Sequence, residues 1–74
     1  MTITIKSGRI DTSGNHYFIE IYQAKFENVW HVGAYSSNVA GGLYRTITDR
    51  TYTNIESAKK RYSYLKRKAK QNEL

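Results

Sequence analysis

The sequence has 74 residues, a net charge of +6, many tyrosines, and neither cysteine nor proline. A chain of this length forms one domain, residues 1–74, and buries only about 60% of the surface its unfolded state exposes, which excludes a deep catalytic cleft. Without cysteine it has no disulfide or thiolate metal site, and no apolar stretch has the length of a signal peptide or membrane span. We therefore expect a cytoplasmic protein with no membrane partner.

The first two strands are predicted on either side of a short turn. Thr2–Lys6 alternates polar residues with isoleucine, which is the period of a half-buried strand. Ser13-Gly14-Asn15 follows as a turn, because glycine and asparagine tolerate positive φ. The segment 16–26 is rich in aromatic and β-branched residues and predicts the second strand. Both faces of this strand carry apolar side chains, so which face the helix covers is left open.

Two further strands, joined by a loop, are predicted in the second half of the sheet. Val29–Tyr35 predicts a third strand with Trp30, Val32 and Ala34 on one face. A loop is expected over 36–42, where two glycines are adjacent. Leu43–Thr48 predicts a fourth strand, and Asp49-Arg50 is expected to turn the chain toward a helix. The strands, all within 2–48, form an antiparallel meander of three or four strands.

A helix is predicted over about 54–71. Thr53 and Glu56 have the spacing of a capping box, in which each side chain satisfies an unpaired backbone N–H of the first turn. Apolar residues then recur three and four positions apart, which places one stripe against the sheet. The stripe consists of Ile55, Ala58, Tyr62, Leu65 and Ala69. We therefore predict an α+β fold with one C-terminal amphipathic basic helix packed on one face of the sheet.

The positive charge is concentrated on this helix. Residues 1–56 contain five basic and five acidic residues, whereas 57–70 contain seven basic residues and no acidic one. A solvated helix usually mixes signs, because like charges four residues apart repel. A merely solvated face is the alternative, but the single sign favours an anionic partner. The candidate contact residues are Lys59, Lys60, Arg61, Lys66, Arg67, Lys68 and Lys70.

Aromatic residues divide into expected core and expected contact residues. Trp30, Phe18 and Tyr62 are assigned to the core, since a small domain with few leucines builds its core partly from aromatics. The candidate contact aromatics are Tyr44, Tyr64 and whichever of Tyr22 and Tyr17 faces outward.

Arg45 is a further candidate on the fourth strand. Its guanidinium could bind a phosphate or the edge of a guanine base. The alternative is a salt bridge to Glu20 or Asp49.

No catalytic pattern is present. His16 and His31 lack the spacing of a metal site, no glycine-rich phosphate loop opens the helix, and no nucleophilic cysteine exists. We expect no enzyme activity, no metal and no cofactor.

The layout of the sequence resembles AP2-type DNA-binding domains and the arm-type domains at the N-terminus of tyrosine integrases. The residues that carry this resemblance are Trp30, the segment Thr51-Tyr52-Thr53 before the helix, and the helix positions Ile55, Ala58 and Tyr62. The resemblance implies a sheet whose exposed face enters the major groove, with the helix behind it. The strands here lack the arginine and tryptophan pattern of AP2-type domains. The two lysine-rich runs of the helix are also similar to the last helix of double-stranded-RNA-binding domains, which binds phosphates, although the first helix of that fold is missing.

Three hypotheses follow. The first is a small nucleic-acid-binding protein that contacts the phosphates of DNA or RNA through its C-terminal helix. The second is a phage-type inhibitor, similar to anti-CRISPR proteins, that binds and blocks a host protein or nucleoprotein complex. The third is a purely structural or dimerising domain that uses an unpaired sheet edge.

Overall fold

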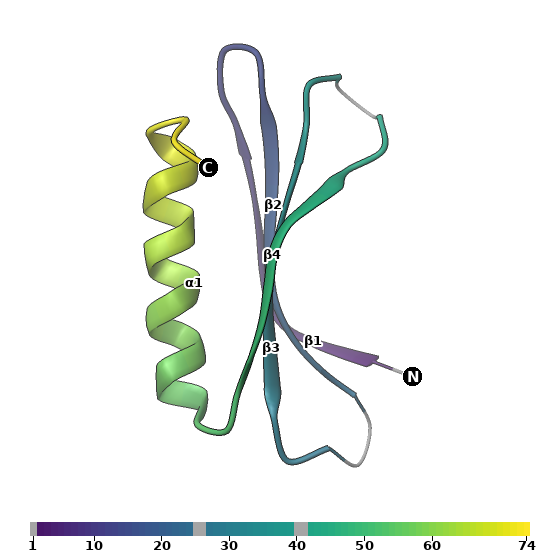
Figure 1. Cartoon of the computed structure of the whole chain (residues 1–74), viewed down its shortest axis with the longest axis vertical. Coiled ribbons are helices and arrows are strands. Elements are labelled where there is room, and N and C mark those ends of the chain that lie inside the picture. Colours follow the sequence, from purple (N-terminus) through teal and green to yellow (C-terminus); the bar gives the residue numbers. More distant parts are fainter. Residues whose placement is uncertain (1, 25–26, 40–41) are drawn as a thin grey trace.

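A computed structural model, which describes residues 2–24, 27–39 and 42–74, shows a four-stranded antiparallel sheet and one helix (Figure 1). The strands follow one another in the order β1-β2-β3-β4, so each hairpin joins neighbours in the sheet. The helix follows the last strand and packs on one face, mainly over β2 and β3. The predicted α+β meander with a C-terminal helix is therefore confirmed. Its elements are β1 (Thr2–Asp11), β2 (His16–Ala24), β3 (Trp30–Ser37), β4 (Arg45–Tyr52) and α1 (Ile55–Lys70).

The core lies between α1 and the middle strands. The helix covers the face of β2 that carries Tyr17, Ile19 and Ile21, all of them buried. Small residues at facing positions let the helix lie close to the sheet. The remaining core residues are Val32 and Ala34 of β3 and the helix stripe Ala58, Tyr62, Leu65 and Ala69, with Trp30 and Ile55 partly buried beside them.

Phe18 was wrongly assigned to the core. Strand alternation places it opposite Arg9 and Tyr35, on the face of the sheet that α1 does not cover. The row with Tyr17 is the more apolar of the two rows of β2, so burying that row removes more apolar surface from water.

Three strands extend beyond their predicted ends. β1 continues to Asp11 because its second half pairs with β2, and β4 runs through Asp49 and Arg50 instead of turning there. Asp49 pairs with Gly33 and Arg50 with Val32, so both residues belong to the ladder with β3 and continue the strand. The predicted loop over 36–42 begins later, since β3 extends through Ser37. The predicted end of the second strand, at 25–26, and part of that loop, at 40–41, lie outside the described residues.

The helix begins one residue later than a cap at Thr53 requires. Asn54 is the N-cap, and its side-chain oxygen accepts a hydrogen bond of 2.7 Å from the backbone N–H of Glu56. Glu56 therefore occupies the second helical position, and the predicted capping box is wrong. Asparagine caps a helix at least as well as threonine does. Among the described residues, no helix is long and apolar enough to cross a bilayer.

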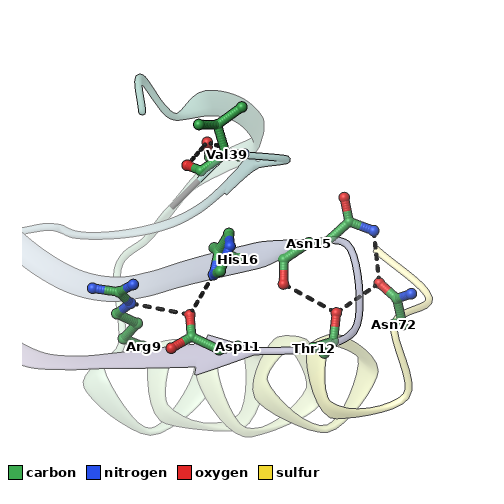
Figure 2. Close-up of polar contacts among 8 residues, drawn as sticks. Arg9, Asp11, Thr12, Asn15, His16, Val39 and Asn72 are labelled. Carbon is green, nitrogen blue, oxygen red and sulfur yellow. Dashed lines mark hydrogen bonds and ion pairs between the residues drawn. The ribbon is translucent and has the colours of Figure 1, made fainter. Parts of the chain in front are cut away.

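The end of α1 is fastened to the β1–β2 hairpin (Figure 2). The predicted turn is present, and Gly14 in it has a φ of +102°. Asn72, which follows the helix, accepts hydrogen bonds at its side-chain oxygen from Thr12 (3.2 Å), Asn15 (2.9 Å) and the hydroxyl of Tyr17. These contacts fix the rotation of the helix about its axis and hence the direction in which its exposed side faces.

Candidate nucleic-acid interface

The side of α1 that faces away from the sheet carries the predicted basic residues. Because the buried stripe occupies one side of the helix, the other positions around its axis reach solvent. Lys59, Lys60, Arg67 and Lys70 are exposed, whereas Arg61, Lys66 and Lys68 are partly buried beside the sheet. We call the following group the basic helix surface: Lys59, Lys60, Arg61, Tyr64, Lys66, Arg67, Lys68 and Lys70.

Two lysines of this surface have acidic neighbours. The ammonium of Lys59 lies 3.9 Å from the carboxylate of Glu56, and that of Lys68 lies 3.0 Å from the carboxylate of Glu73. The hydrogen bond that Lys68 donates to Glu73 raises the pKa of Lys68. The expectation that the charges of the helix lack all counter-charge is therefore corrected at these two positions, where acids flank the basic run in sequence.

The other five basic residues of the surface make no ion pair within the described residues. These residues are Lys60, Arg61, Lys66, Arg67 and Lys70. A surface cation without a carboxylate partner can bind an external anion without first breaking an ion pair.

Tyr64 lies at the centre of the basic helix surface. Its side chain is 40% exposed. The guanidinium carbon of Arg61 lies 5.1 Å from the centre of its ring, and the charged groups of Arg67 and Lys68 each lie 5.9 Å away. Cation–π attraction gathers these three side chains around the ring. The result is an aromatic group surrounded by positive charge, the combination on which unpaired bases stack while cations hold the phosphates.

Lys6 of β1 extends the positive charge to the edge of the sheet, and the sequence did not indicate this. Its ammonium lies 5.0 Å from the centre of the Tyr62 ring, and the ammonium of Lys66 lies 6.0 Å from the same ring. A register shift between Thr4 and Lys6 places these two residues on opposite faces of the sheet. Simple alternation puts them on the same face, so only the observed pairing reveals that Lys6 lies beside the helix.

The hydroxyl of Tyr62 is buried and has no hydrogen-bond partner among the residues that the structure describes. Burial raises its pKa, and the tyrosine is a neutral core residue in contact with lysine.

The two candidates on or beside β4 lie on different sides of the sheet. Arg45 pairs with Ser36, in the row of Tyr17, which places it on the helix side. Its alternative, a salt bridge to Glu20 or Asp49, is not formed. Tyr44 packs edge-on against Phe18 on the other side, with 6.4 Å between ring centres. The structure thus brings Tyr64 to the basic helix surface and separates Tyr44 from it.

The face of the sheet away from α1 carries acidic and aromatic side chains. We call it the open face, and its main residues are Arg9, Asp11, His16, Phe18, Glu20, Tyr22, His31, Tyr35, Tyr44 and Asp49. Phe18 stacks on Tyr35 with 6.1 Å between ring centres, and Tyr22 stacks on His31 at 4.8 Å. Tyr22, the outward-facing member of the Tyr17 and Tyr22 pair, therefore belongs to this face.

Phenol groups hold two carboxylates of the open face in place. The hydroxyl of Tyr22 donates to Asp49 at 2.6 Å, and the hydroxyl of Tyr35 donates to Glu20 at 3.1 Å. The hydrogen bond to Asp49 is the main reason that the pKa of Tyr22 rises to about 12, with burial second. Burial, followed by the charge of Glu20, raises the pKa of Tyr35. Both tyrosines are therefore neutral hydrogen-bond donors at physiological pH.

The remaining carboxylates near this face have basic or imidazole partners. Asp11 lies between His16 (2.8 Å) and Arg9 (3.1 Å), and these contacts lower its pKa (Figure 2). Glu27, in the β2–β3 connection, lies 2.9 Å from His31, which lowers the pKa of Glu27. Neither histidine belongs to a group of three potential metal ligands within the described residues, and no pocket is found there.

Comparisons with protein-family models, with curated proteins and with solved structures gave no significant match. These comparisons therefore give no support to a relationship with AP2-type or integrase arm-type domains. The resemblance implied that the exposed face of the sheet enters the major groove, and the charge of the open face disfavours this. Among the described strand residues, Arg9 is the only arginine or lysine on the open face. An acidic face repels the phosphates of a major groove.

Proposed function

We propose that the protein binds nucleic acid through the basic helix surface, by contacts to phosphates and without catalysis. The observation that carries the proposal is the set of five helix cations, among them Arg61 and Arg67, that have no carboxylate partner within the described residues. Polyanions with regularly spaced phosphates supply the missing counter-charge. The cysteine-free sequence supports a cytoplasmic setting.

This mode of binding has a recognisable thermodynamic signature. Contacts to phosphates release condensed counterions, so the logarithm of the binding constant falls linearly with the logarithm of the salt concentration. Such contacts fix the position of the protein but carry little sequence information. We therefore expect strong salt dependence and weak sequence specificity. Arg45, on the helix side of the sheet, would add a further phosphate contact.

The test is a fluorescence-anisotropy titration against duplex DNA, single-stranded DNA and structured RNA at several salt concentrations. Replacing Lys66, Arg67, Lys68 and Lys70 together by glutamine removes four of the seven helix cations, and about half of the salt slope should disappear. Arg9→Gln is the matched control, because Arg9 lies on the open face and its loss should leave the slope unchanged. An unaltered slope in the quadruple variant would contradict the proposal.

A second candidate function is supported by the open face. A phage-type inhibitor similar to anti-CRISPR proteins would bind a host protein or nucleoprotein complex, and aromatic residues such as Phe18, Tyr22 and Tyr35 are enriched in protein interfaces. The two candidates differ in a simple measurement. The first requires binding to naked nucleic acid at physiological salt, whereas the second does not.

A further inference from the structure

The open face carries negative charge without a positive partner, and the basic helix surface carries positive charge without a negative partner. Glu20 and Asp49 occupy one row of the sheet, on either side of Gly33. Each carboxylate accepts a hydrogen bond from an uncharged phenol, and neither has an ion-pair partner within the described residues. On the opposite side of the molecule, five helix cations also lack a partner. Each surface therefore presents uncompensated charge that is complementary to the other.

The shapes of the two surfaces are compatible. The helix has 16 residues and is about 24 Å long, from a rise of about 1.5 Å per residue. The central strands have 9 and 8 residues and span about 27 Å at roughly 3.3 Å per residue. Gly33 has no side chain, and the Tyr35 ring lies over it. A straight helix can thus lie along a face of similar length with aromatic rings in contact with its cations.

Two open faces, in contrast, do not complement each other. Pairing them about a two-fold axis would bring the acidic row of Glu20 and Asp49 of one copy toward the acidic side chains of the other. Like charges in an interface cost free energy once water is removed from around them. The occupant that suits this face is a cationic one, and the chain itself carries such an element.

We propose that the protein associates with itself head to tail, with the basic helix surface of one copy seated on the open face of the next. The two patches differ, so the contact is heterologous and generates rings or open chains of copies. One helix on one four-stranded face buries an area at the low end of the range for specific complexes. Salt screens such an interface, so the association is weak and strongest at low ionic strength. This inference does not depend on nucleic-acid binding, since its test contains no nucleic acid.

The test uses two variants of the full chain in sedimentation velocity at low salt. The face variant, Glu20→Gln with Asp49→Asn, keeps the hydrogen-bond acceptors for the two phenols but removes both charges. The helix variant replaces Lys60, Arg67 and Lys70 by glutamine at exposed positions. Wild type is expected to form species larger than the monomer, in proportion to its concentration, and to dissociate at about 0.5 M salt. Each variant alone is expected to remain monomeric.

Mixing the two variants is the decisive step. The face variant still has its helix, and the helix variant still has its open face, so an equimolar mixture should form a 1:1 dimer that grows no further. Arg50→Gln removes an exposed positive charge of β4 outside both surfaces and should associate as wild type does. Circular dichroism checks that every variant is folded. Monomeric wild type at all concentrations would overturn the proposal. So would loss of association in only one of the two variants, or a mixture that stays monomeric.

Discussion

The basic helix surface and the open face of the sheet are both exposed, but they differ in how their charged groups are held. On the open face, Glu20 and Asp49 each accept a hydrogen bond from a phenol, and the rings of these phenols are stacked on Phe18 and His31. On the helix, five cations have no carboxylate partner within the described residues, and they extend on long side chains. The carboxylates of the sheet are thus held by hydrogen bonds, whereas the five helix cations have no carboxylate to hold them.

This difference suggests how each surface recognises a partner. A rigid, preorganised surface loses little conformational entropy on binding and favours one geometry. Long mobile cations adapt to many arrangements of phosphate groups and contribute affinity more than specificity.

The largest expected effect is on stability and compares one tyrosine from each surface. Tyr35→Ala should lower the free energy of unfolding by about 2 to 3 kcal/mol, because the ring packs on Phe18 and covers Gly33. Tyr64→Ala should change it by less than about 0.5 kcal/mol, since the ring is exposed and its cation–π neighbours belong to its own helix. Urea unfolding of both variants measures the difference, and equal losses would contradict the contrast between the two surfaces.

Gly33 offers a second way to probe the rigidity of the open face. A Cβ atom at this position would overlap the hydroxyl of Tyr35. Gly33→Ala should therefore displace the ring and cost about 1 to 2 kcal/mol. Tyr35→Phe removes the overlapping oxygen, so the double variant should be more stable than the sum of the single effects implies. Strict additivity in a double-mutant cycle would show that the ring does not lie over Gly33.

Alkaline pH should weaken the open face through Tyr22. Its pKa rises from 10.0 to about 12 in the folded protein. A raised pKa means that the hydrogen bond to Asp49 contributes its full stability below pH 10 and that this contribution is lost as the pH approaches 12. The pKa values of Tyr22, Tyr35 and Tyr62 are all raised, and the late part of the tyrosinate absorbance curve should move to lower pH in Asp49→Asn, mainly through Tyr22. An identical titration of the two proteins would mean that the carboxylate does not control this phenol.

The smallest expected change in stability is a gain, and it concerns the helix. Ser63 is exposed, and lysine or arginine lies three and four residues away from it on both sides. Ser63→Glu should raise the free energy of unfolding by about 0.5 kcal/mol through these neighbours and weaken nucleic-acid binding through the same charges. Ser63→Gln is the neutral control. If Ser63→Glu both stabilises the protein and leaves binding intact, the helix is not the binding surface.

The sequence predicted the elements whose signals are local. The helix stripe from Ala58 to Ala69 and the turn at Gly14 depend on residues a few positions apart, and the structure confirms both. The predicted helix, about 54–71, differs from the observed Ile55–Lys70 by one residue at each end. The charge of the candidate site was likewise visible, because it is concentrated in one segment.

The features that the sequence did not predict depend on pairing between distant segments. Asp49 and Arg50 indicated a turn, yet their pairing with β3 keeps them in a strand. Both faces of β2 are apolar, so only packing against α1 distinguishes Tyr17 from Phe18. The charge separation between the two sides of the sheet, including the position of Lys6, follows from register shifts that no periodicity in the sequence reveals.

The attachment of Asn72 to the first hairpin also bears on the order in which the protein folds. Its hydrogen bonds to Thr12, Asn15 and Tyr17 join residues 55 to 60 positions apart. The hairpins β1–β2, β2–β3 and β3–β4 form between neighbours in sequence, whereas this closure requires that nearly the whole described chain has been synthesised. Contacts of such sequence separation slow folding, because the chain between them must be ordered before they form. A chain that ends before residue 72 therefore lacks the contacts that anchor the end of the helix to the first hairpin.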